Sequence, residues 1–584
     1  MISVRVGMAS CGIAAGAQKV YDALCAKGFD VKKTGCIGSC YAEPIVEIKK
    51  DDFETLIFEH VVPSDIESII NSVNKNKKHP KLFAKRKDGI KKIDFDYVDD
   101  LSFYKNQVKR VSANCGIIDP EDIEDAISNG AYKALGKALL MKQEDVVSEI
   151  DKAGLRGRGG AGFPTGRKWK GMLAASSPKF LICNFDEGDP GAFMNRVLAE
   201  SDPHLVIEGI LIAAYAIGAD KAFIYTRAEY PLAVKRLNLA LSQAKEKGLF
   251  GKKGLVDVDI DLVLGAGAYV CGEETALISS IEGNTGRPHP KPPFPFQKGI
   301  LGRPTNINNI ESLAHVTLIM RNGFDWFRAK GTDTSPGTKM FSFSGNTEYG
   351  GYVEVPLGTT LKDILRIAKV DTSNIKGVQI GGPSGGCIPM SFLNLPIDYD
   401  HVGEANAILG SGSFVIISKD QDMVELARFF LSFSLSESCG QCVPCREGVK
   451  RMHELLTKIL DNKGTNKDLN DLEELSETIQ QTALCGLGKA APNPVVSVIK
   501  NFREDFVSHF MKGSLSDPAE TFYINPGKCI GCHICSSKCP TGAITGRPFG
   551  IHTINQQLCI RCGSCYNSCK TKAIEIKKVE EIAN

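Results

Sequence analysis

The chain has 584 residues and a formal net charge of +2, with 43% hydrophobic and 24% charged residues. A domain usually contains roughly 100–200 residues, so this length excludes a single core and predicts roughly three to five domains. A charge so close to neutral provides no strong field for nucleic acid or an anionic membrane, and we expect neither as a partner.

Targeting signals are not evident. The first ten residues, MISVRVGMAS, contain no basic segment followed by a long apolar one, so we expect no secretory signal peptide. The most apolar segment, residues 209–219, is too short to span a bilayer and predicts a buried helix or strand. We therefore expect a cytoplasmic protein without membrane insertion.

The 20 cysteines are the most informative part of the composition. Without a secretion signal, a disulfide framework is not expected. Eight cysteines fall within residues 529–569, and three fall within residues 439–445. Thiolates grouped in this way in a reducing compartment usually bind metal.

Residues 1–74 are expected to form a small α/β domain. The segment SVRVGM predicts a strand, residues 14–27 a helix, and a second strand precedes Cys36. PIVEIKK alternates like a further strand. Residues 75–92 follow, and half of them are Lys or Arg. This charge predicts a solvated basic linker, with a docking arm for an acidic partner as the alternative.

Residues 93–335 are predicted to form the main α/β domain. The glycine-rich segment GLRGRGGAGFPTGRKW, residues 154–169, lets backbone N–H groups approach a phosphate or a flat ring, and Arg158 and Lys168 add positive charge. It is not a clean G-x-G-x-x-G at a strand–helix junction, so a standard Rossmann fold is not indicated.

Two polar loops strengthen this interpretation. The segment LICNFDEGDPGAFMNR places a group of polar side chains after an apolar strand, and GAGAYVCGEETAL forms a second group. These groups comprise Asn184, Asp186, Glu187 and Asp189, and Tyr269, Gly272, Glu273 and Glu274. Carboxylates can accept hydrogen bonds from ribityl or ribose hydroxyls. Any one of them alone would be explained equally well as a solvated loop residue.

Residues 336–420 suggest a β-grasp-like unit, with VEVPLGTTLKDIL and AILGSGSFVIIS as strand-rich segments. Residues 421–515 repeat apolar residues at three to four positions, which predicts a helical bundle. Within the bundle, Cys439, Cys442 and Cys445 follow the spacing C-x2-C-x2-C. Cys485 is the nearby candidate for the fourth ligand of a [4Fe-4S] cluster.

Residues 516–584 contain two C-x2-C-x2-C-x3-C runs that repeat at a 30-residue offset. In runs of this two-cluster ferredoxin type, the fourth cysteine of each run binds the other cluster. One [4Fe-4S] cluster is thus assigned to Cys529, Cys532, Cys535 and Cys569, and the other to Cys559, Cys562, Cys565 and Cys539. A pair of zinc knuckles is the alternative, but zinc sites favour paired C-x2-C units. His533 is expected to be a surface residue and not a ligand.

Together these segments resemble the nucleotide-oxidising FMN/iron–sulfur subunit of respiratory complex I. They are also similar to its relatives in soluble, electron-bifurcating NAD(P)-linked [FeFe]-hydrogenases. The resemblance implies a non-classical α/β fold for the FMN- and NAD(P)-binding domain. It implies FMN contacts at Gly157, Arg158, Gly159, Gly160, Lys168, Asn184, Asp186, Glu187, Asp189, Tyr269, Gly272, Glu273, Glu274, Asn308 and Asn309. It also implies that Phe163 and Phe294 stack on the nicotinamide nucleotide and that Lys291 contacts its polar part; for the two aromatics a core position is the alternative.

The first domain resembles a thioredoxin-like [2Fe-2S] domain, which normally offers C-x4-C and C-x3-C. Cys36 and Cys40 supply the second pair, but the first is reduced to Cys11, with Gly16 at the position of its partner. Because four ligands are required, the presence of a [2Fe-2S] cluster stays open. His509 occupies a position where some relatives have a zinc site, but no cysteine accompanies it, so we expect no zinc.

The expected function follows from electron counting. A nicotinamide gives two electrons as a hydride, a cubane accepts one, and a flavin does both, so the flavin stands between them. No side chain is required as a general base. We expect an NAD(P)H dehydrogenase (diaphorase) subunit in a hetero-oligomeric, electron-bifurcating complex. Its partners would be ferredoxin, a small [2Fe-2S] thioredoxin-like subunit, and a hydrogenase, formate dehydrogenase or transhydrogenase. The alternatives are a complex I subunit and a flavin-free iron–sulfur scaffold.

Overall fold

The computed structural model describes residues 2–464, 466–510, 520–559 and 561–578. It divides the chain into two compact units, Met1–Lys419 and Asp420–Asn584, and each is described by itself. No helix among the described residues is long and apolar enough to cross a membrane. The multidomain α/β architecture agrees with the sequence, while the boundaries of the five predicted domains stay a prediction.

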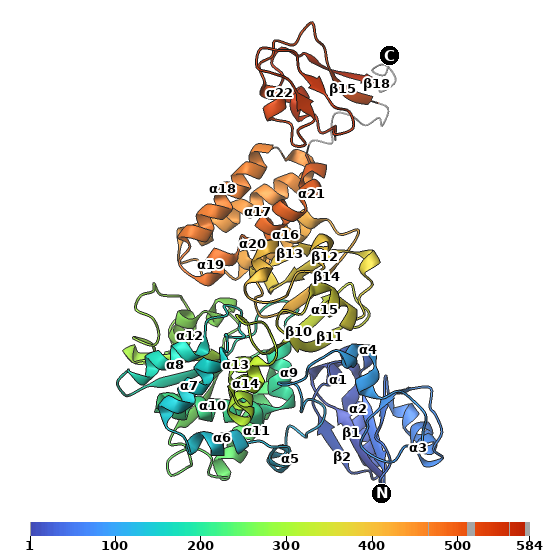
Figure 1. Ribbon diagram of the computed structural model, residues 1–584, viewed down its shortest axis with the longest axis vertical. Helices are drawn as coiled ribbons and strands as arrows, with labels where there is room; N and C mark the ends of the chain where they lie inside the picture. The colour runs from blue at the N-terminus through green and yellow to red at the C-terminus, as the bar shows by residue number, and fades with distance from the viewer. Residues whose placement is uncertain (1, 465, 511–519, 560, 579–584) are drawn as a thin grey trace. The chain divides into compact units, whose positions relative to one another are not determined.

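The first unit begins with a five-stranded sheet in the order β2-β1-β3-β4-β5. Its strands are β1 (Ile2–Gly7), β2 (Val31–Thr34), β3 (Val46–Lys50), β4 (Leu56–Phe58) and β5 (Leu82–Lys85). Only β1 and β2 among these pairs run parallel. Helices α1 (Ser10–Ala15), α2 (Ala17–Ala26) and α3 (Ile66–Asn74) accompany the sheet (Figure 1). The helix expected over residues 14–27 is interrupted at Gly16. This glycine has a φ of 106°, in the left-handed region, and α1 ends there.

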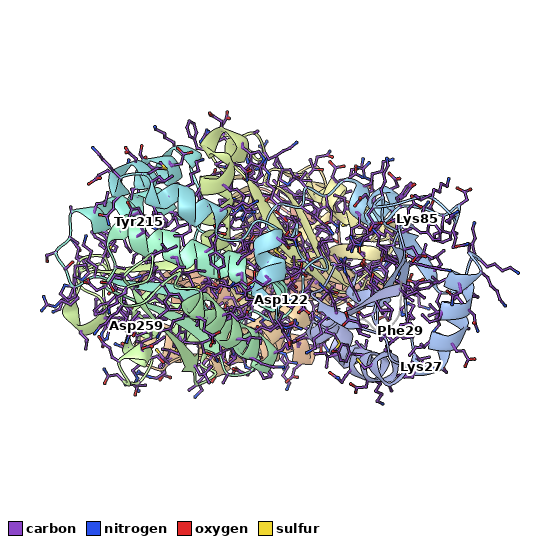
Figure 2. The ribbon with its side chains drawn as sticks, turned by 90° about the horizontal axis from the view of Figure 1, so that it is seen from below. Lys27, Phe29, Lys85, Asp122, Tyr215 and Asp259 are labelled. Atoms are coloured by element: carbon purple, nitrogen blue, oxygen red, sulfur yellow. The ribbon has the colours of Figure 1, made fainter. Side chains whose placement is uncertain are left out.

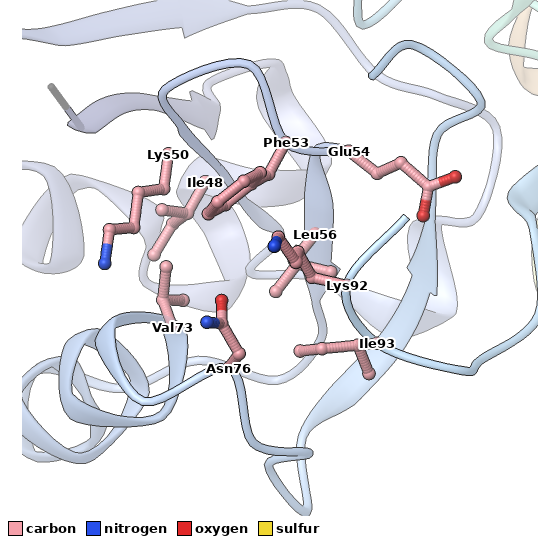
Figure 3. Close-up of a pocket in the computed structure, with 9 residues that line it drawn as sticks. All are labelled: Ile48, Lys50, Phe53, Glu54, Leu56, Val73, Asn76, Lys92 and Ile93. Carbon is pink, nitrogen blue, oxygen red and sulfur yellow. The ribbon is translucent and has the colours of Figure 1, made fainter. Parts of the chain in front are cut away.

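The basic segment 75–92 is not a solvated tether. It contains β5, which pairs with β4, and its Lys85 side chain is fully buried (labelled in Figure 2). The Lys85 ammonium donates to Glu54 Oε2 at 2.7 Å and to the Ile93 carbonyl at 3.1 Å. Figure 3 shows Lys92 at a small pocket of the same domain, lined also by Val73 of α3. The expectation failed because charge was counted without the three consecutive apolar residues of β5, of which Leu82 and Ala84 are buried.

The centre of the first unit is a four-stranded parallel sheet in the order β8-β7-β6-β9. The strands are β6 (Phe180–Phe185), β7 (Lys221–Arg227), β8 (Asp259–Gly265) and β9 (Thr305–Asn309). Helices α7 (Gln143–Ala153), α8 (Thr165–Leu173), α9 (Met194–Ser201), α10 (Pro203–Ile217), α11 (Pro231–Glu246), α12 (Glu274–Ile281) and α13 (Ile310–Asn322) belong to this region. The apolar segment 209–219 falls largely in α10, which is buried except at Tyr215, so the buried element predicted there is confirmed.

The strand order reverses at β6. The chain moves from β6 to β7 to β8 in one direction, whereas β9 returns to the other side of β6. The connections that follow β6 and β9 therefore leave the sheet at a point where its winding reverses. In open parallel sheets, ligands bind outside the carboxyl ends of the strands at such a point.

The first unit ends with a sheet in the order β11-β10-β14-β12-β13. Its elements are β10 (Thr338–Gly345), β11 (Gly351–Pro356), α15 (Leu361–Ile367), β12 (Ile375–Ile380), β13 (Gly386–Pro389) and β14 (Ser413–Ser418). The buried Glu354 of β11 accepts hydrogen bonds from the backbone N–H groups of Arg110, Val111 and Ser112. This carboxylate fixes the connection that leads into the parallel-sheet region.

The second unit contains a helical part and a small β-rich part. The helices are α16 (Met423–Ser436), α17 (Val449–Lys458), α18 (Asn466–Thr482), α19 (Gly486–Ala490), α20 (Asn493–Asn501) and α21 (Arg503–Ser508). The β-rich part pairs β15 (Glu520–Ile524) with β18 (Ile574–Lys578) and β16 (Ile544–Thr545) with β17 (Thr553–Ile554). Its helices α22 (Ile534–Ser537) and α23 (Ser564–Ser568) come from the two halves of the sequence repeat.

Candidate cofactor sites

The predicted asparagines meet at the carboxyl edge of the parallel sheet. Asn184 of β6 pairs in register with Asn309 of β9, and the preceding residue Cys183 pairs with Asn308. Asn184 Nδ2 donates to the Gly272 carbonyl at 3.0 Å, which brings the second polar loop to the same edge. Three segments that are far apart in the sequence therefore converge where the strand order predicts a ligand.

The glycine-rich loop connects α7 to α8 and closes on itself, because Gly157 N–H donates to the Phe163 carbonyl at 2.9 Å. A Cβ on Gly159 would lie 3.1 Å from Asn309 Cβ. Gly160 has a φ of 120°, and a Cβ there would approach the Gly410 backbone to 3.2 Å. Glycine is required at these two positions because the loop runs closely between the end of β9 and the segment around Gly410.

The Arg158 side chain does not have the role that the sequence suggested. It is fully buried, and its guanidinium donates to the carbonyl oxygens of Arg156, Pro336 and Thr338 at 2.8–3.1 Å. A guanidinium that is surrounded by carbonyls is committed to holding the loop against β10. The positive charge available for a phosphate or a nucleotide must come from elsewhere.

Lysine side chains supply that charge at the edge of the sheet. Lys168 of α8 pairs with Glu274 and donates to the Ile307 carbonyl at 3.1 Å. Lys291 lies 2.9 Å from a Glu273 oxygen and 3.2 Å from Glu274 Oε2. Burial opposes ionisation of Glu274, but the two ammonium groups hold the pKa of its carboxyl below its usual range. Glu273 also caps α12 by accepting from the N–H of Thr275 and Ala276.

The carboxylates of the first polar loop are held in different ways. Asp186 forms an ion pair with Arg227 at 3.1 Å. Glu187 is buried and accepts from the N–H groups of Asn195 and Arg196, both at 2.9 Å, in the first turn of α9. Burial raises the pKa of the Glu187 carboxyl to about 7. These contacts fix the loop that follows β6.

Asp189 links the two polar loops to the last sheet of the unit. Its carboxylate accepts from Tyr269 Oη and from Ser411 Oγ, each at 2.5 Å. Burial raises the pKa of the Asp189 carboxyl, although these two hydroxyl groups act in the opposite direction. A Cβ on Gly382 would lie 2.6 Å from the Asp189 carboxyl carbon, so this part of the site is tightly packed.

The two aromatics expected to stack on a nucleotide are accessible. Phe163 is 48% exposed and Phe294 is 45% exposed, which excludes core positions for both rings. The Lys168 ammonium lies 5.8 Å from the centre of the Phe163 ring. An exposed ring beside a cation is suited to an anionic ligand with a flat part.

Some residues that contribute to this region were not predicted from the sequence. Arg227 ends β7 at the same carboxyl edge, and the rule for parallel strands could have found it. Trp169 Nε1 donates to Asn308 Oδ1 at 2.9 Å, and Tyr399 Oη donates to the Gly157 carbonyl at 2.8 Å. Nothing in the local sequence predicted that Ser411 would bind Asp189 or that Tyr399 would bind Gly157. Both contacts arise because the last part of the first unit packs onto the first polar loop and the glycine-rich loop.

The cysteines of the β-rich part surround two cavities. Each cavity is lined by three thiols from one run and the fourth thiol of the other. Cys529, Cys532, Cys535 and Cys569 line one cavity, and Cys539, Cys559, Cys562 and Cys565 line the other. Four thiols and no carboxylate form a donor set that suits an iron–sulfur cluster. His533 is half-buried and lies 2.8 Å from His552, so it is not the surface residue that was expected.

The helical part places its cysteines at helix ends. Cys439, Cys442 and Cys445 follow α16, and Cys485 directly precedes α19. A Cβ on Gly488 of α19 would lie 3.5 Å from Cys445 Sγ, so the helix after Cys485 packs on the cysteine-rich loop. His509, in the same part, lies 2.5 Å from Asp422 Oδ2.

In the N-terminal domain, the sulfur atoms of Cys11, Cys36 and Cys40 all lie within 4.8 Å of one another. The separation of the Cys36 and Cys40 sulfurs is 3.6 Å. Cys25 is exposed in α2 and does not belong to this group. The fold therefore brings the three thiols together as a candidate metal site.

Comparisons with known proteins agree with this arrangement. Residues 150–318 match the Nuo51 FMN-binding domain, residues 425–509 the NADH-ubiquinone oxidoreductase-F iron-sulfur binding region, and residues 522–545 and 552–575 the 4Fe-4S binding domain. The NADP-reducing hydrogenase subunit HndC of Solidesulfovibrio fructosivorans is 46% identical over 453 residues, which cover 76% of this chain and 92% of HndC.

Other relatives come from two kinds of complex. An NADH-quinone oxidoreductase subunit of Aquifex aeolicus is 40% identical, covering 67% of this chain and 92% of that subunit. A crystal structure of an NAD+-reducing [NiFe]-hydrogenase in the H2-reduced state has a TM-score of 0.62 and 30% identity, covering 88% of this chain and 85% of that chain.

The fold, the site and the matches define the class of protein. It is an NAD(P)-linked oxidoreductase subunit with FMN and [4Fe-4S] clusters, of the hydrogenase or complex I type. The chain belongs to the Nuo51 family, the family of the complex I FMN/iron–sulfur subunit. The family predicted from the glycine-rich, acidic and cysteine motifs is confirmed.

Proposed function

We propose that this chain oxidises NAD(P)H, or reduces NAD(P)+, as the diaphorase subunit of a cytoplasmic, electron-bifurcating complex. The observation that carries the proposal is the convergence of Lys168, Asn184 and Glu274 at the reversal point of the parallel sheet in the FMN-binding domain. When bound, FMN accepts two electrons as a hydride and releases them singly to iron–sulfur clusters.

The side chains at this edge of the sheet would bind and orient the two ligands. The backbone of Gly157, Arg158, Gly159 and Gly160 would line the flavin pocket, with the charge supplied by Lys168. The other flavin contacts would be Asn184, Asp186, Glu187, Asp189, Tyr269, Gly272, Glu273, Glu274, Asn308 and Asn309. Phe163 and Phe294 would stack on the nicotinamide nucleotide, and Lys291 would contact its polar part. None of these residues is required as an acid or a base.

Three [4Fe-4S] clusters would follow the flavin. We assign the first to Cys439, Cys442, Cys445 and Cys485, and the other two to the thiol sets that line the two cavities of the β-rich part. Cys569→Ser tests the crossed assignment. It should remove the cluster of the Cys529 run and leave the cluster of its own run, as measured by iron content and EPR. Loss of the Cys559 cluster alone would contradict the crossed assignment.

The complex is proposed from the relatives. HndC is named as a subunit of an NADP-reducing hydrogenase, and a 36% identical relative as the alpha subunit of an NAD-reducing hydrogenase. We infer a further redox subunit acting on H2, formate or another nucleotide, and a small [2Fe-2S] thioredoxin-like subunit. The added two-cluster module supports exchange with ferredoxin, and hence bifurcation. For the N-terminal domain we propose a thioredoxin-like class with a [2Fe-2S] centre, and for residues 336–420 a β-grasp-like class.

A complex I type of subunit is the second candidate, favoured by the 40% identity to the Aquifex subunit. Native purification, with mass spectrometry of the co-purifying subunits, separates the two candidates. A soluble hydrogenase, formate dehydrogenase or transhydrogenase supports the proposal, whereas quinone-reducing membrane subunits support the second candidate. A purified, reconstituted chain that holds no flavin and reduces no dye with NADH or NADPH would contradict both and leave an iron–sulfur scaffold.

A further inference from the structure

The three thiols of the N-terminal domain form an incomplete ligand set. Cys11 lies in α1, Cys36 follows β2, and Cys40 begins a short 3-10 helix (Cys40–Ala42). Metal–sulfur bonds of about 2.3 Å at a tetrahedral angle place two sulfurs roughly 3.8 Å apart. The 3.6 Å separation of the Cys36 and Cys40 sulfurs is close to this value. A structural zinc ion or a [2Fe-2S] cluster takes four protein ligands, so three thiols leave one position open.

Glu43 brings a carboxylate to this group. The residue is only 5% exposed, and its Oε1 lies 3.8 Å from Cys11 Sγ. Its other oxygen, Oε2, accepts from the Ile45 N–H at 2.8 Å. One oxygen is therefore fixed by the backbone, while the second faces the Cys11 thiol.

Two glycines make room for the carboxylate. A Cβ on Gly7 would lie 3.0 Å from both Glu43 oxygens, and a Cβ on Gly12 would lie 3.1 Å from Oε2 and 2.2 Å from the Gly7 carbonyl oxygen. The end of β1 and the start of α1 can therefore pack around Glu43 only because Gly7 and Gly12 carry no Cβ. By contrast, Gly16 has no atom within 4 Å of the position of a Cβ, so a side chain at this residue would face open space.

We propose that Glu43 is the fourth ligand of the metal centre that Cys11, Cys36 and Cys40 hold. The site would have three thiolates and one carboxylate. In a [2Fe-2S] cluster each iron takes two protein ligands, which the Cys36–Cys40 and Cys11–Glu43 pairs would provide. This inference deepens the proposed function, because it rests on the [2Fe-2S] centre proposed for this domain. Zinc also accepts thiolate and carboxylate ligands together, so the ligand set serves either metal.

The centre would adjoin the flavin domain. Ser10 donates from its N–H and its hydroxyl to Glu200, and the Cys36 N–H donates to Ser201 Oγ at 3.2 Å. Both acceptors belong to α9, and the Arg196 N–H in the first turn of this helix binds Glu187 at the sheet edge. A single helix thus connects the surroundings of the thiols with the proposed flavin pocket.

The test uses the full chain, purified without oxygen and reconstituted with iron and sulfide. Iron, sulfide and zinc are counted for each variant, and EPR is recorded at temperatures where reduced [4Fe-4S] clusters relax too fast to be seen. Glu43→Gln should lose the same two irons and the same EPR signal as Cys36→Ser. Glu43→Cys should retain the metal with shifted g values. Glu67→Gln and Cys25→Ser change exposed residues and should match the wild type.

The outcomes separate this inference from the proposed function. Retention of metal and spectrum by Glu43→Gln would overturn it, as would a Cys36→Ser variant with the same metal content as the wild type. Retention by Glu43→Cys shows that loss in Glu43→Gln is not misfolding. One zinc ion, lost from both Glu43→Gln and Cys36→Ser, supports Glu43 as a ligand and replaces the [2Fe-2S] assignment. NAD(P)H-dependent dye reduction, measured on the same samples, reports separately on the flavin site.

Discussion

At the scale of single residues, burial decides which charged groups serve the site and which serve the fold. Arg158 and Lys168 lie in the same glycine-rich segment, and the sequence suggested the same role for both. The structure commits the Arg158 guanidinium to three carbonyls, while Lys168 is at the sheet edge with Glu274. Only the second charge can be shared with a ligand, because a hydrogen-bonded guanidinium in the core cannot turn outward without leaving carbonyls unpaired.

Replacement of this lysine tests the flavin site. Lys168→Met removes a charged hydrogen-bond donor from this edge of the sheet, and such a bond contributes about 1.5–3 kcal/mol. We expect FMN affinity to fall roughly 10- to 150-fold, which can be measured by fluorescence titration of the flavin-free chain. Lys170→Met is the matched control, because Lys170 lies on the same helix as Lys168, is 57% exposed and pairs with Asp151 of α7. Equal FMN affinity in Lys168→Met and the wild type would remove Lys168 from the site.

The buried Glu187 carboxyl should make the free energy of unfolding depend on pH. Its pKa in the folded chain is about 7, above the ordinary value of 4.5, because the carboxyl is buried. The folded state therefore binds the proton more tightly than the unfolded state, and stability falls as the pH rises from about 4.5 to about 7. The difference corresponds to about 3 kcal/mol.

Glu187→Gln should remove this part of the pH dependence. The measurement is thermal or urea unfolding of the flavin-free chain between pH 4.5 and 8, with the variant subtracted from the wild type. Glu246→Gln, at an exposed position of α11, should leave the profile unchanged. A flat difference profile would show that Glu187 keeps an ordinary carboxyl pKa, and a profile that rises with pH would show a lowered pKa; either result would contradict the prediction.

At the scale of elements, strand β5 was not predicted because its segment is rich in lysine and arginine. The sequence around β5 carries many lysines, but the strand places Leu82 and Ala84 in the core and neutralises Lys85 with Glu54. For the glycine-rich loop, by contrast, the composition predicted a loop whose backbone can approach a ligand closely. Its position between β9 and Gly410 depends on a sheet that begins much later in the chain, at Thr338.

Breaking the buried pair distinguishes a strand from a tether. Lys85→Met leaves the Glu54 carboxylate buried without its partner, which typically costs about 3–5 kcal/mol. We expect faster hydrogen exchange at the paired residues Ile57 and Ala84, measured by mass spectrometry after proteolysis. Lys87→Met changes an exposed lysine two residues away and should leave exchange unaltered. Similar exchange in both variants would mean that β5 does not contribute to the sheet.

At the scale of the whole molecule, all proposed flavin and nucleotide contacts belong to the first unit, whereas the twelve cysteines assigned to [4Fe-4S] clusters belong to the second. This division would place the flavin in the first unit and the three [4Fe-4S] clusters in the second. The first unit also contains the thiol cluster with Glu43, so it would hold its own metal centre. Bifurcation, as proposed, would require both units and the partner subunits.

Separation of the units should separate the activities. A chain ending at Lys419 is expected to bind FMN and to reduce a two-electron dye with NADH or NADPH. It should lose the iron of the three [4Fe-4S] clusters and all ferredoxin reduction, because these cysteines are absent. Absorbance, iron analysis and a ferredoxin assay against the full chain provide the comparison. Ferredoxin reduction by the shortened chain would contradict the proposed electron path.

The sequence by itself determined the cysteine groups and the family. Thiol spacing is local, since C-x2-C-x2-C fits one cluster face within a single turn of chain, and the repeat predicted which fourth cysteine crosses over. The polar loops could also be found, because each follows an apolar strand. Their convergence at the carboxyl edge could not be derived, since strand order depends on which sheet neighbours pack best over the whole domain.

Only the tertiary structure decided which side chains face the site. It buried Arg158 among carbonyls, exposed Phe163 and Phe294, and placed Lys85 in a sheet core. It also brought Glu43 against Cys11 between two glycines, although no spacing rule connects a lone glutamate with three thiols. These outcomes depend on contacts between residues far apart in the sequence, and periodicity and composition describe only near neighbours.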